Sequence, residues 1–288
     1  MTVLLGVATR IRLARLLLIT DLREAQADLP GFVEAALSGG VDVLQLRDPA
    51  ADQSALTDGF TNVRQVVLRH RALLGVYDSL PVAEAVKSDL LQLSERGMDA
   101  SSARRRLHEY ALVGRSCHSR REVDAALADS QVDYLMVGPV VGGLPLPGSG
   151  LDLVRHAAAA APPSGPDSKP WFAVGGITTE NLDEVLAAGA RRIAVSSAIT
   201  AAEDPRASAR ALTARLAQAW KDDPGMERVV FSAFGTNPGT APASPGGARP
   251  VAPRSSRPLI DQAGPDGGTA LRQPPDSPGL GQGRAPQA

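Results

Sequence analysis

Residues 171–195 read WFAVGGITTENLDEVLAAGARRIAV, and this stretch holds one complete unit of the pattern that decides the fold. Two short apolar runs, Trp171–Val174 and Ile193–Val195, flank a longer amphipathic segment, Thr179–Ala188. Apolar residues in that segment recur at helical spacing. A strand, a helix and a second strand in this order predict two parallel strands joined by a crossover helix.

The same alternation extends over most of the chain. Further apolar runs, each followed by a segment rich in Ala, Arg and Glu, are Leu16–Thr20, Val43–Leu46, Leu73–Val76, Leu90–Leu93, Leu112–Arg115 and Tyr134–Val137. Eight parallel strands close a (β/α)8 TIM barrel, an α/β fold. The alternative is an open doubly wound sheet, which usually has a glycine-rich loop after its first strand, and LLLITDLREAQ (16–26) has none. The sequence therefore favours the barrel.

The alternation stops near Lys221, where the composition changes. Residues 222–288 contain more than half of the 23 prolines and show no period of a strand or a helix. Such a segment cannot bury enough apolar surface to offset the entropy lost on ordering. We expect a barrel over residues 1–221 and a disordered Pro/Gly-rich tail over residues 222–288, in which Met226–Phe234 is one short run that could dock on the barrel.

Composition and charge exclude several classes of protein. The chain is 43% hydrophobic and 21% charged, as ordinary globular proteins are. A net charge of −1 gives no basic field for nucleic acid or an anionic membrane. The first 21 residues, interrupted by arginines, match neither a spanning helix nor a cleaved signal. Cys117 is the only cysteine in the sequence. We therefore expect a cytoplasmic protein without an intramolecular disulfide.

A phosphate site is predicted where the last two strands end. In TIM barrels the active site lies at the carboxyl ends of the strands, and phosphate often binds in the last two loops. Gly175 and Gly176 follow the seventh strand, and Ser196 and Ser197 follow the eighth. Glycine lets backbone N–H groups approach an anion, and the serines add hydroxyl groups. The alternative is that the two glycines only form a tight turn.

Other strand ends supply candidates for binding and proton transfer. Gln45 and Arg47 alternate along the second strand and therefore face the same side, and Ser116 and Gly138 follow the fifth and sixth strands. His118 is the candidate acid/base, since imidazole titrates near neutral pH; a surface histidine is the alternative. For Arg47 the alternative is a buried ion pair with Asp48 or Asp21. Cys117 and His118 are neighbours and face opposite ways, which argues against a nucleophile pair.

Taken in order, these segments resemble the thiamine phosphate synthase/TenI superfamily. The matching stretches span about Leu16 to Leu216 and are LLLITD (16–21), GGVDVLQLRD (39–48), VGRSCHS (113–119), DYLMVGPV (133–140), WFAVGGIT (171–178) and AVSSAITAAEDP (194–205). The resemblance implies a barrel that holds a small phosphorylated thiazole substrate in the last two loops.

The chain departs from the synthase motifs of that family at four places. Pro49 stands where the family has a lysine, and Tyr77-Asp78 replaces an Asn-Asp pair. Gly97 replaces the second metal-binding aspartate, and VGGLPLPG (141–148) replaces a longer loop with a lysine. These changes remove groups that would bind Mg²⁺ and pyrophosphate, so the chain resembles the TenI-like thiazole tautomerases more than the synthases.

The sequence therefore predicts three functions in order of preference. The first is metal-free tautomerisation of a thiazole phosphate carboxylate, an isomerase reaction without a cofactor. His118 would be the acid/base, Gln45, Arg47, Ser116 and Gly138 would bind the substrate, and the glycine and serine loops would hold the phosphate. The second is a divergent thiamine phosphate synthase, a transferase with Asp78 as a residual Mg²⁺ ligand. The third is a non-catalytic phosphate-binding barrel. The sequence does not decide between a monomer and a homo-oligomer.

Overall fold

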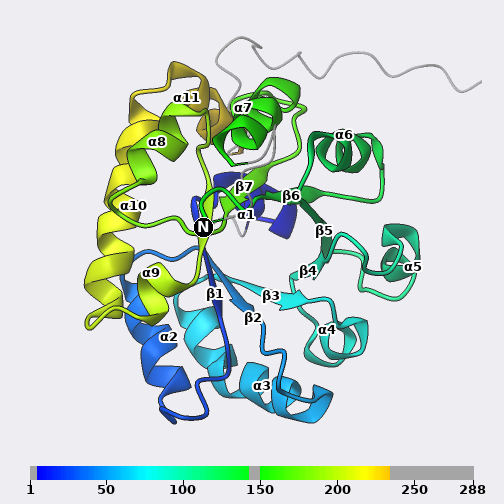
Figure 1. The fold of residues 1–288 in the computed structure, drawn as a ribbon. Helices are drawn as coiled ribbons and strands as arrows, with labels where there is room; N and C mark the ends of the chain where they lie inside the picture. Colours follow the sequence, from blue (N-terminus) through cyan, green and yellow to red (C-terminus); the bar gives the residue numbers. More distant parts are fainter. Residues whose placement is uncertain (1–4, 143–149, 234–288) are drawn as a thin grey trace, which may run out of the picture. The chain divides into compact units, whose positions relative to one another are not determined.

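The computed structural model describes residues 5–142 and 150–233 and confirms the (β/α)8 barrel. Its strands form a closed parallel sheet in sequence order, with helices around the outside (Figure 1). The strands are β1 (Leu16–Thr20), β2 (Val43–Leu46), β3 (Leu73–Tyr77), β4 (Leu90–Leu93), β5 (Leu112–Cys117), β6 (Tyr134–Val137), β7 (Trp171–Val174) and β8 (Ile193–Val195). The barrel closes where β8 pairs with β1, with Leu16 opposite Ile193.

Several of the helices begin at a residue whose side chain caps a free N–H group. Asp52 accepts a hydrogen bond from Ala55 N, Ser119 from Glu122 N, and Asp204 from Ala207 N; such caps stabilise the first turn. The helices are α1 (Val7–Leu13), α2 (Leu29–Ser38), α3 (Gln53–Arg69), α4 (Leu80–Val86), α5 (Ala100–Arg104), α6 (Arg120–Ala128), α7 (Leu151–Ala160), α8 (Leu182–Ala187), α9 (Ser197–Thr200), α10 (Pro205–Lys221) and α11 (Pro224–Ala233).

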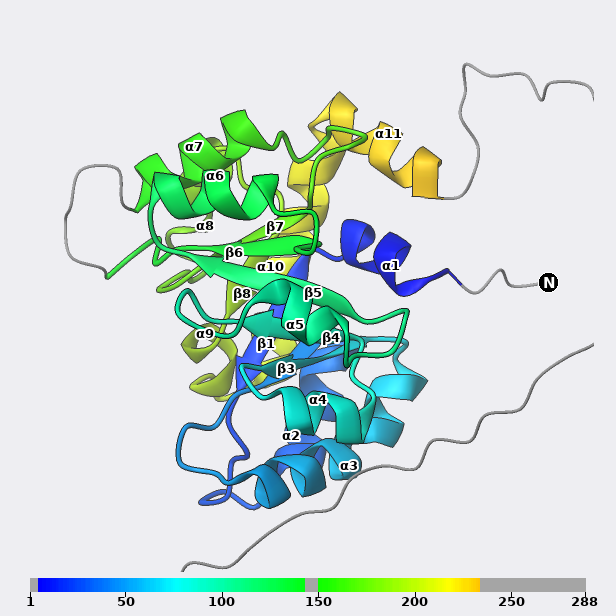
Figure 2. The same cartoon turned by 90° about the vertical axis from the view of Figure 1, so that its right-hand side faces the viewer.

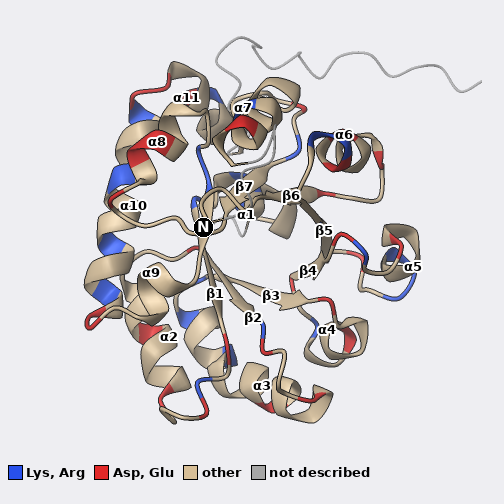
Figure 3. Ribbon diagram, viewed as in Figure 1, with Lys and Arg blue, Asp and Glu red and all other residues tan. Residues whose placement is uncertain are grey.

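Alternation along the strands separates two apolar layers. One face of the strands packs against the outer helices in the larger core cluster. The other face fills the barrel with Leu17, Val43, Leu73, Tyr134 and Phe172, among others. Charged residues lie on the helices and loops around this core, with both signs mixed (Figure 3). None of the described helices is long and apolar enough to span a membrane.

Aspartates in front of alternate strands join neighbouring strands at their amino ends. Asp42 precedes β2 and accepts a hydrogen bond from Leu16 N at 3.1 Å. Asp89 precedes β4 and accepts one from Leu74 N at 2.8 Å, and Asp133 precedes β6 and accepts one from Val113 N at 2.7 Å. Each carboxylate satisfies a backbone N–H group in the first two residues of the neighbouring strand, which would otherwise have to find water.

Helix α1 closes the amino-terminal end of the barrel, a role that the sequence did not indicate. Ile11 is 2% exposed and packs with Ala14 against the apolar residues of the barrel interior. Figure 2 shows α1 at one end of the barrel, apart from the helices of the outer ring. A ligand can therefore reach the interior more readily from the opposite end, where the strands terminate.

Helix α11 continues the described fold past Lys221. Its Met226 and Val229 are buried in a small cluster with Trp220 of α10. The short run at Met226 therefore docks on the barrel, through residues up to Ala233. The rest of the expected tail, residues 234–288, lies outside the described residues, as do residues 143–149 of the loop after β6.

Candidate functional site

A hollow of about 610 Å³ lies at the carboxyl ends of β1, β2, β7 and β8. It brings together five of the residues that the sequence selected, from segments far apart in the chain: Arg47, Gly175, Gly176, Ser196 and Ser197. The strand-end rule for TIM barrels thus locates a cavity here. That these residues bind phosphate remains a prediction.

The loop after β7 has a backbone that favours glycine. Gly175 has φ +104° and Gly176 has φ +65°, both in the left-handed region. A Cβ atom on Gly176 would lie 2.7 Å from Val141 O. Asn181 fixes this loop by accepting a hydrogen bond from Thr178 N at 2.9 Å and donating one to Gly176 O at 2.8 Å. The loop is therefore both rigid and open to a ligand on its backbone side.

Two arginines line the hollow, and they differ in how much of their charge is available. Arg47 is exposed, and its guanidinium lies 4.4 Å from the ring centre of Tyr77. The alternative of a buried ion pair between Arg47 and Asp48 or Asp21 is therefore wrong. Arg23 is held by Asp28 through contacts of 2.6 and 2.9 Å, and this pairing lowers the pKa of the Asp28 carboxyl. Arg47 is thus the cation with more charge to offer a ligand.

His118 lies at the mouth of the barrel between two oxygen atoms. Its Nδ1 is 2.5 Å from Gly138 O, and its Nε2 is 3.4 Å from the Glu95 carboxylate. Glu122 also accepts a hydrogen bond from His118 N at 2.6 Å. These contacts fix the ring while 43% of the side chain stays exposed. Because Nδ1 is occupied by a carbonyl, Nε2 is the atom that can exchange a proton with a ligand or with Glu95.

The segment Gly138-Pro139 lies between His118 and the loop after β7, Gly175-Gly176. Gly138 receives the His118 contact on one side, and Pro139 lies against Gly175 on the other, where a Cβ on Gly175 would be 2.8 Å from Pro139 Cα. The histidine and the glycine loop therefore lie on opposite sides of this segment, and His118 is not among the residues that line the hollow.

Two predicted binding residues lie inside the barrel below this mouth. Gln45 is 1% exposed, and its Nε2 has no hydrogen-bond partner among the described residues. Ser116 is 8% exposed and accepts a hydrogen bond from Gln92 Nε2 at 3.0 Å. Buried polar atoms usually find a partner. One buried donor without a partner, Gln45 Nε2, therefore lies beneath the mouth and can serve a ligand or water that enters it.

The residues at the expected Mg²⁺ position do not form the carboxylate pair that such a site needs. Asp78 Oδ2 accepts a hydrogen bond from Ser94 Oγ at 2.7 Å, and Asp78 Oδ1 accepts one from Ser94 N at 3.2 Å. A Cβ on Gly97 would lie 2.5 Å from Asp78 Oδ1. The glycine thus lets the loop close on Asp78. Among the described residues no group of three acidic, His or Cys side chains could hold a metal.

Cys117 is buried and chemically quiet. Its side chain is 0% exposed, and burial raises the pKa of its thiol to about 12. Since the thiolate is the reactive form, we expect no labelling by Ellman's reagent in the folded protein at pH 8 and full labelling of 1 thiol in guanidinium. Rapid labelling of the native protein would show that the strand end opens.

The sequence did not select three residues that shape this site. Glu95 lies in the loop after β4, Arg23 lies three residues beyond the end of β1, and Asn181 lies in the loop before α8. The Asn-Leu pair at the start of an apolar helical period signals a helix start. The role of Glu95 depends on its contact with His118, which comes from a distant segment, and has no local signal. Arg23, by contrast, pairs with the nearby Asp28.

Comparison with known proteins adds the family. A family model described as thiamine monophosphate synthase matches residues 16–199. The chain belongs to this thiamine monophosphate synthase/TenI family. A thiamine-phosphate synthase from Thermobifida fusca is 45% identical over 213 residues, which cover 73% of this chain and 95% of that relative. A thiamine-phosphate synthase from Streptomyces avermitilis is 45% identical over 209 residues, 72% of this chain and 95% of that relative.

A solved structure supports the same assignment. Thiamine phosphate pyrophosphorylase from Pyrococcus furiosus matches with a TM-score of 0.62 and 29% identity, covering 73% of this chain and 98% of that one. The protein is thus an enzyme of thiamine biosynthesis by family. The expectation that it lies closer to the TenI-like tautomerases is not supported, because these relatives carry the name of the synthase.

Proposed function

We propose that this protein catalyses the thiamine-phosphate synthase reaction, which joins a pyrimidine pyrophosphate to a thiazole phosphate. The observation that carries the proposal is the 45% identity to a thiamine-phosphate synthase over 95% of that relative's length. In the reaction, the thiazole nitrogen forms a C–N bond to the pyrimidine methylene carbon. The C–O bond to pyrophosphate breaks, and pyrophosphate leaves with the electron pair.

The residues of the site divide this task. The backbone of Gly175 and Gly176, with Ser196 and Ser197, holds the thiazole phosphate by N–H and O–H donors. Arg47 lies on the same hollow with its charge available, where it would stabilise the negative charge that develops on the leaving pyrophosphate. Because Asp78 is engaged by Ser94, we assign no step to a metal held by Asp78.

The direct test supplies the purified full chain with both substrates. We expect thiamine phosphate and pyrophosphate in equal amounts, measured by chromatography and by a coupled pyrophosphate assay. Parallel reactions with MgCl₂ and with EDTA show whether the pyrophosphate must arrive as a metal complex. Saturable binding of thiazole phosphate without any product would contradict the synthase and support the non-catalytic barrel.

One observation favours tautomerisation of a thiazole phosphate carboxylate as a second candidate. His118 is oriented by Gly138 O and lies beside Glu95, with Nε2 directed toward that carboxylate. Such a pair can take a proton from one atom of a bound ring and return it to another. This reaction needs neither the pyrimidine nor a carboxylate pair, and Gly97 has removed one member of that pair.

Replacing His118 with asparagine separates the two reactions. If the protein is a tautomerase, we expect isomerisation to fall by about 10²–10⁴-fold, the usual contribution of a positioned acid/base. Binding of thiazole phosphate, measured by calorimetry, should change little because the phosphate loop is untouched. Full isomerase activity in His118→Asn would remove His118 as the acid/base.

A further inference from the structure

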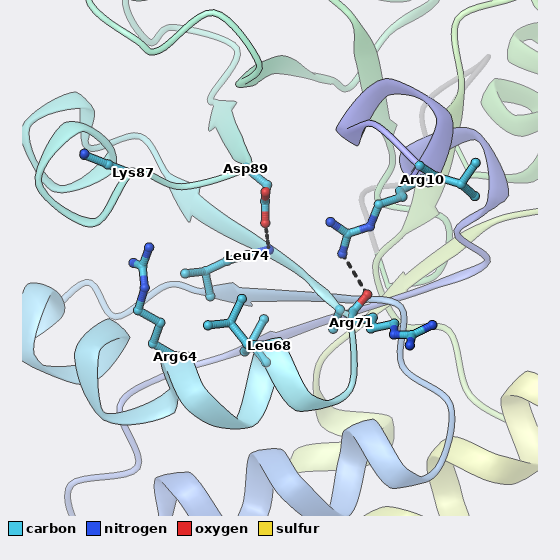
Figure 4. A pocket seen from close by; sticks show the side chains of 10 residues that line it. Arg10, Arg64, Leu68, Arg71, Leu74, Lys87 and Asp89 are labelled. Carbon is cyan, nitrogen blue, oxygen red and sulfur yellow. Dashed lines mark hydrogen bonds between the residues drawn. The ribbon is translucent and has the colours of Figure 1, made fainter. Parts of the chain in front are cut away.

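A second hollow, of about 650 Å³, lies at the end of the barrel opposite the phosphate loops. Its walls come from α1, from the last turns of α3, and from the connection between α4 and β4 (Figure 4). It touches the amino ends of β3 and β4, whereas the phosphate loops follow the carboxyl ends of β7 and β8. The two hollows therefore share no lining residue.

The charge around this second hollow is one-sided. Arg64 and Lys87 lie at one end of it and Arg10 and Arg71 at the other, and Asp89 is the acidic residue among those that line it (Figure 4). The Asp89 carboxylate already accepts a hydrogen bond from Leu74 N at 2.8 Å. Four cationic side chains and one carboxylate thus line the hollow, and this carboxylate is already hydrogen-bonded to the backbone.

These cations have no carboxylate partner among the described residues. Arg64 Nη1 donates to Val86 O at 2.7 Å, and Arg10 Nη2 donates to Arg71 O at 2.7 Å, so both meet neutral oxygens. The side chains of Lys87 and Arg71 make no hydrogen bond or ion pair within residues 5–142 and 150–233. Some arginines elsewhere on the surface do pair with acids, as Arg106 does with Glu84.

The floor between the cations is apolar. Val67 and Leu74 are 3% and 5% exposed and form its base, while Leu68 is 59% exposed beside them. In Figure 4 Leu68 and Leu74 lie between the Arg64–Lys87 end and Arg10. An apolar base with cations at its rim matches a molecule that has an apolar body and an anionic group, because the body gains from burial and the charge from charge-assisted hydrogen bonds.

We propose that this hollow binds a small organic anion with an apolar body, carrying a carboxylate, sulfonate or phosphate group. The anion lies against Lys87 and Arg64, and the body covers Leu68 and Leu74. The site is separate from the phosphate loops, so its occupancy does not depend on the reaction that the protein catalyses.

The test uses two probes that differ in charge: 8-anilinonaphthalene-1-sulfonate and the uncharged N-phenyl-1-naphthylamine. We expect the sulfonate to bind the full chain saturably at one site and the uncharged probe at least about tenfold more weakly, the size of one charge-assisted hydrogen bond. Equal affinity for both probes would overturn the proposal, because the cations would then contribute nothing.

Variants locate the probe. Lys87→Glu reverses an exposed charge without a partner, and we expect it to weaken sulfonate binding about tenfold or more with an unchanged melting temperature. Arg64→Ala should act in the same direction. Arg210→Ala, which removes an exposed guanidinium on α10, is the matched control and should leave the affinity unchanged. Unchanged affinity in Lys87→Glu and Arg64→Ala would overturn the proposal.

Competition completes the assignment. Thiazole phosphate should not displace the sulfonate probe, whereas displacement would place the probe at the phosphate loops and overturn the site. Decanoate and 1-naphthyl phosphate distinguish an aliphatic carboxylate from an aromatic phosphate as the occupant. Displacement by either supports the proposal, and failure of both contradicts it.

Discussion

Replacing Gly176 with valine is expected to raise the Kd for thiazole phosphate by about 100-fold or more. The native residue has φ +65°, which a β-branched side chain adopts only with strain. Its Cβ would also lie 2.7 Å from Val141 O and 2.8 Å from Val141 Cβ. The loop must move to relieve these contacts, and the N–H groups that we propose to bind the phosphate move with it. Calorimetry with thiazole phosphate measures the effect.

Another glycine with a positive φ angle, Gly40, provides the control. Gly40 has φ +103°, and a Cβ there would lie 2.9 Å from Thr213 Cγ2, away from the phosphate loops. Gly40→Ala should lose stability through similar strain and keep the wild-type Kd. If Gly176→Val folds and binds thiazole phosphate as the wild type does, the β7 loop is not the phosphate site.

Gly138→Ala is expected to lower the free energy of unfolding by about 3 kcal/mol or more, the effect of overpacking a rigid site. A Cβ on Gly138 would lie 1.9 Å from Val174 O and 2.9 Å from Val174 C, both backbone atoms of the neighbouring strand. Because no side chain can rotate away, β6 and β7 must separate. For a domain of this size the melting temperature should fall by about 6–12 °C, measured by circular dichroism.

The matched control is an alanine at an unobstructed glycine. Gly31 lies in helix α2, and a Cβ there meets nothing within 4 Å. Gly31→Ala should therefore raise stability by up to about 1 kcal/mol, since glycine is the poorer helix former. An unchanged melting temperature in Gly138→Ala would show that β6 and β7 tolerate the displacement at little cost.

The barrel could be predicted because its signals are local. Four-residue runs such as Tyr134–Val137 and Trp171–Val174 are apolar throughout, as is typical of strands buried on both faces, and the structure has them with the predicted bounds. Asp204 before Pro205 is a local signal for a helix start, and α10 begins there with the carboxylate accepting from Ala207 N. Each of these features depends on neighbours within a few residues.

The site was predictable only in part. The strand-end rule selected Arg47, the glycine pair 175–176 and the serine pair 196–197, and in the structure these residues line one hollow. The strand-end rule could not show that Ser94 binds the Asp78 carboxylate, or that Glu95 lies beside His118. These contacts join residues from different strand ends, which come together when the barrel closes.

The sequence by itself determined the strand order, the helix starts and the glycine loop, because hydrophobic period, capping and backbone freedom act over a few residues. Tertiary structure alone decided that α1 fills one end of the barrel through Ile11, and that Gln45 lies inside it. It also decided that Glu95 lies beside His118, and that Arg47 stays exposed beside the ring of Tyr77. The physical reason is that burial and ion pairing depend on which distant segments meet, and closure of the barrel sets those meetings.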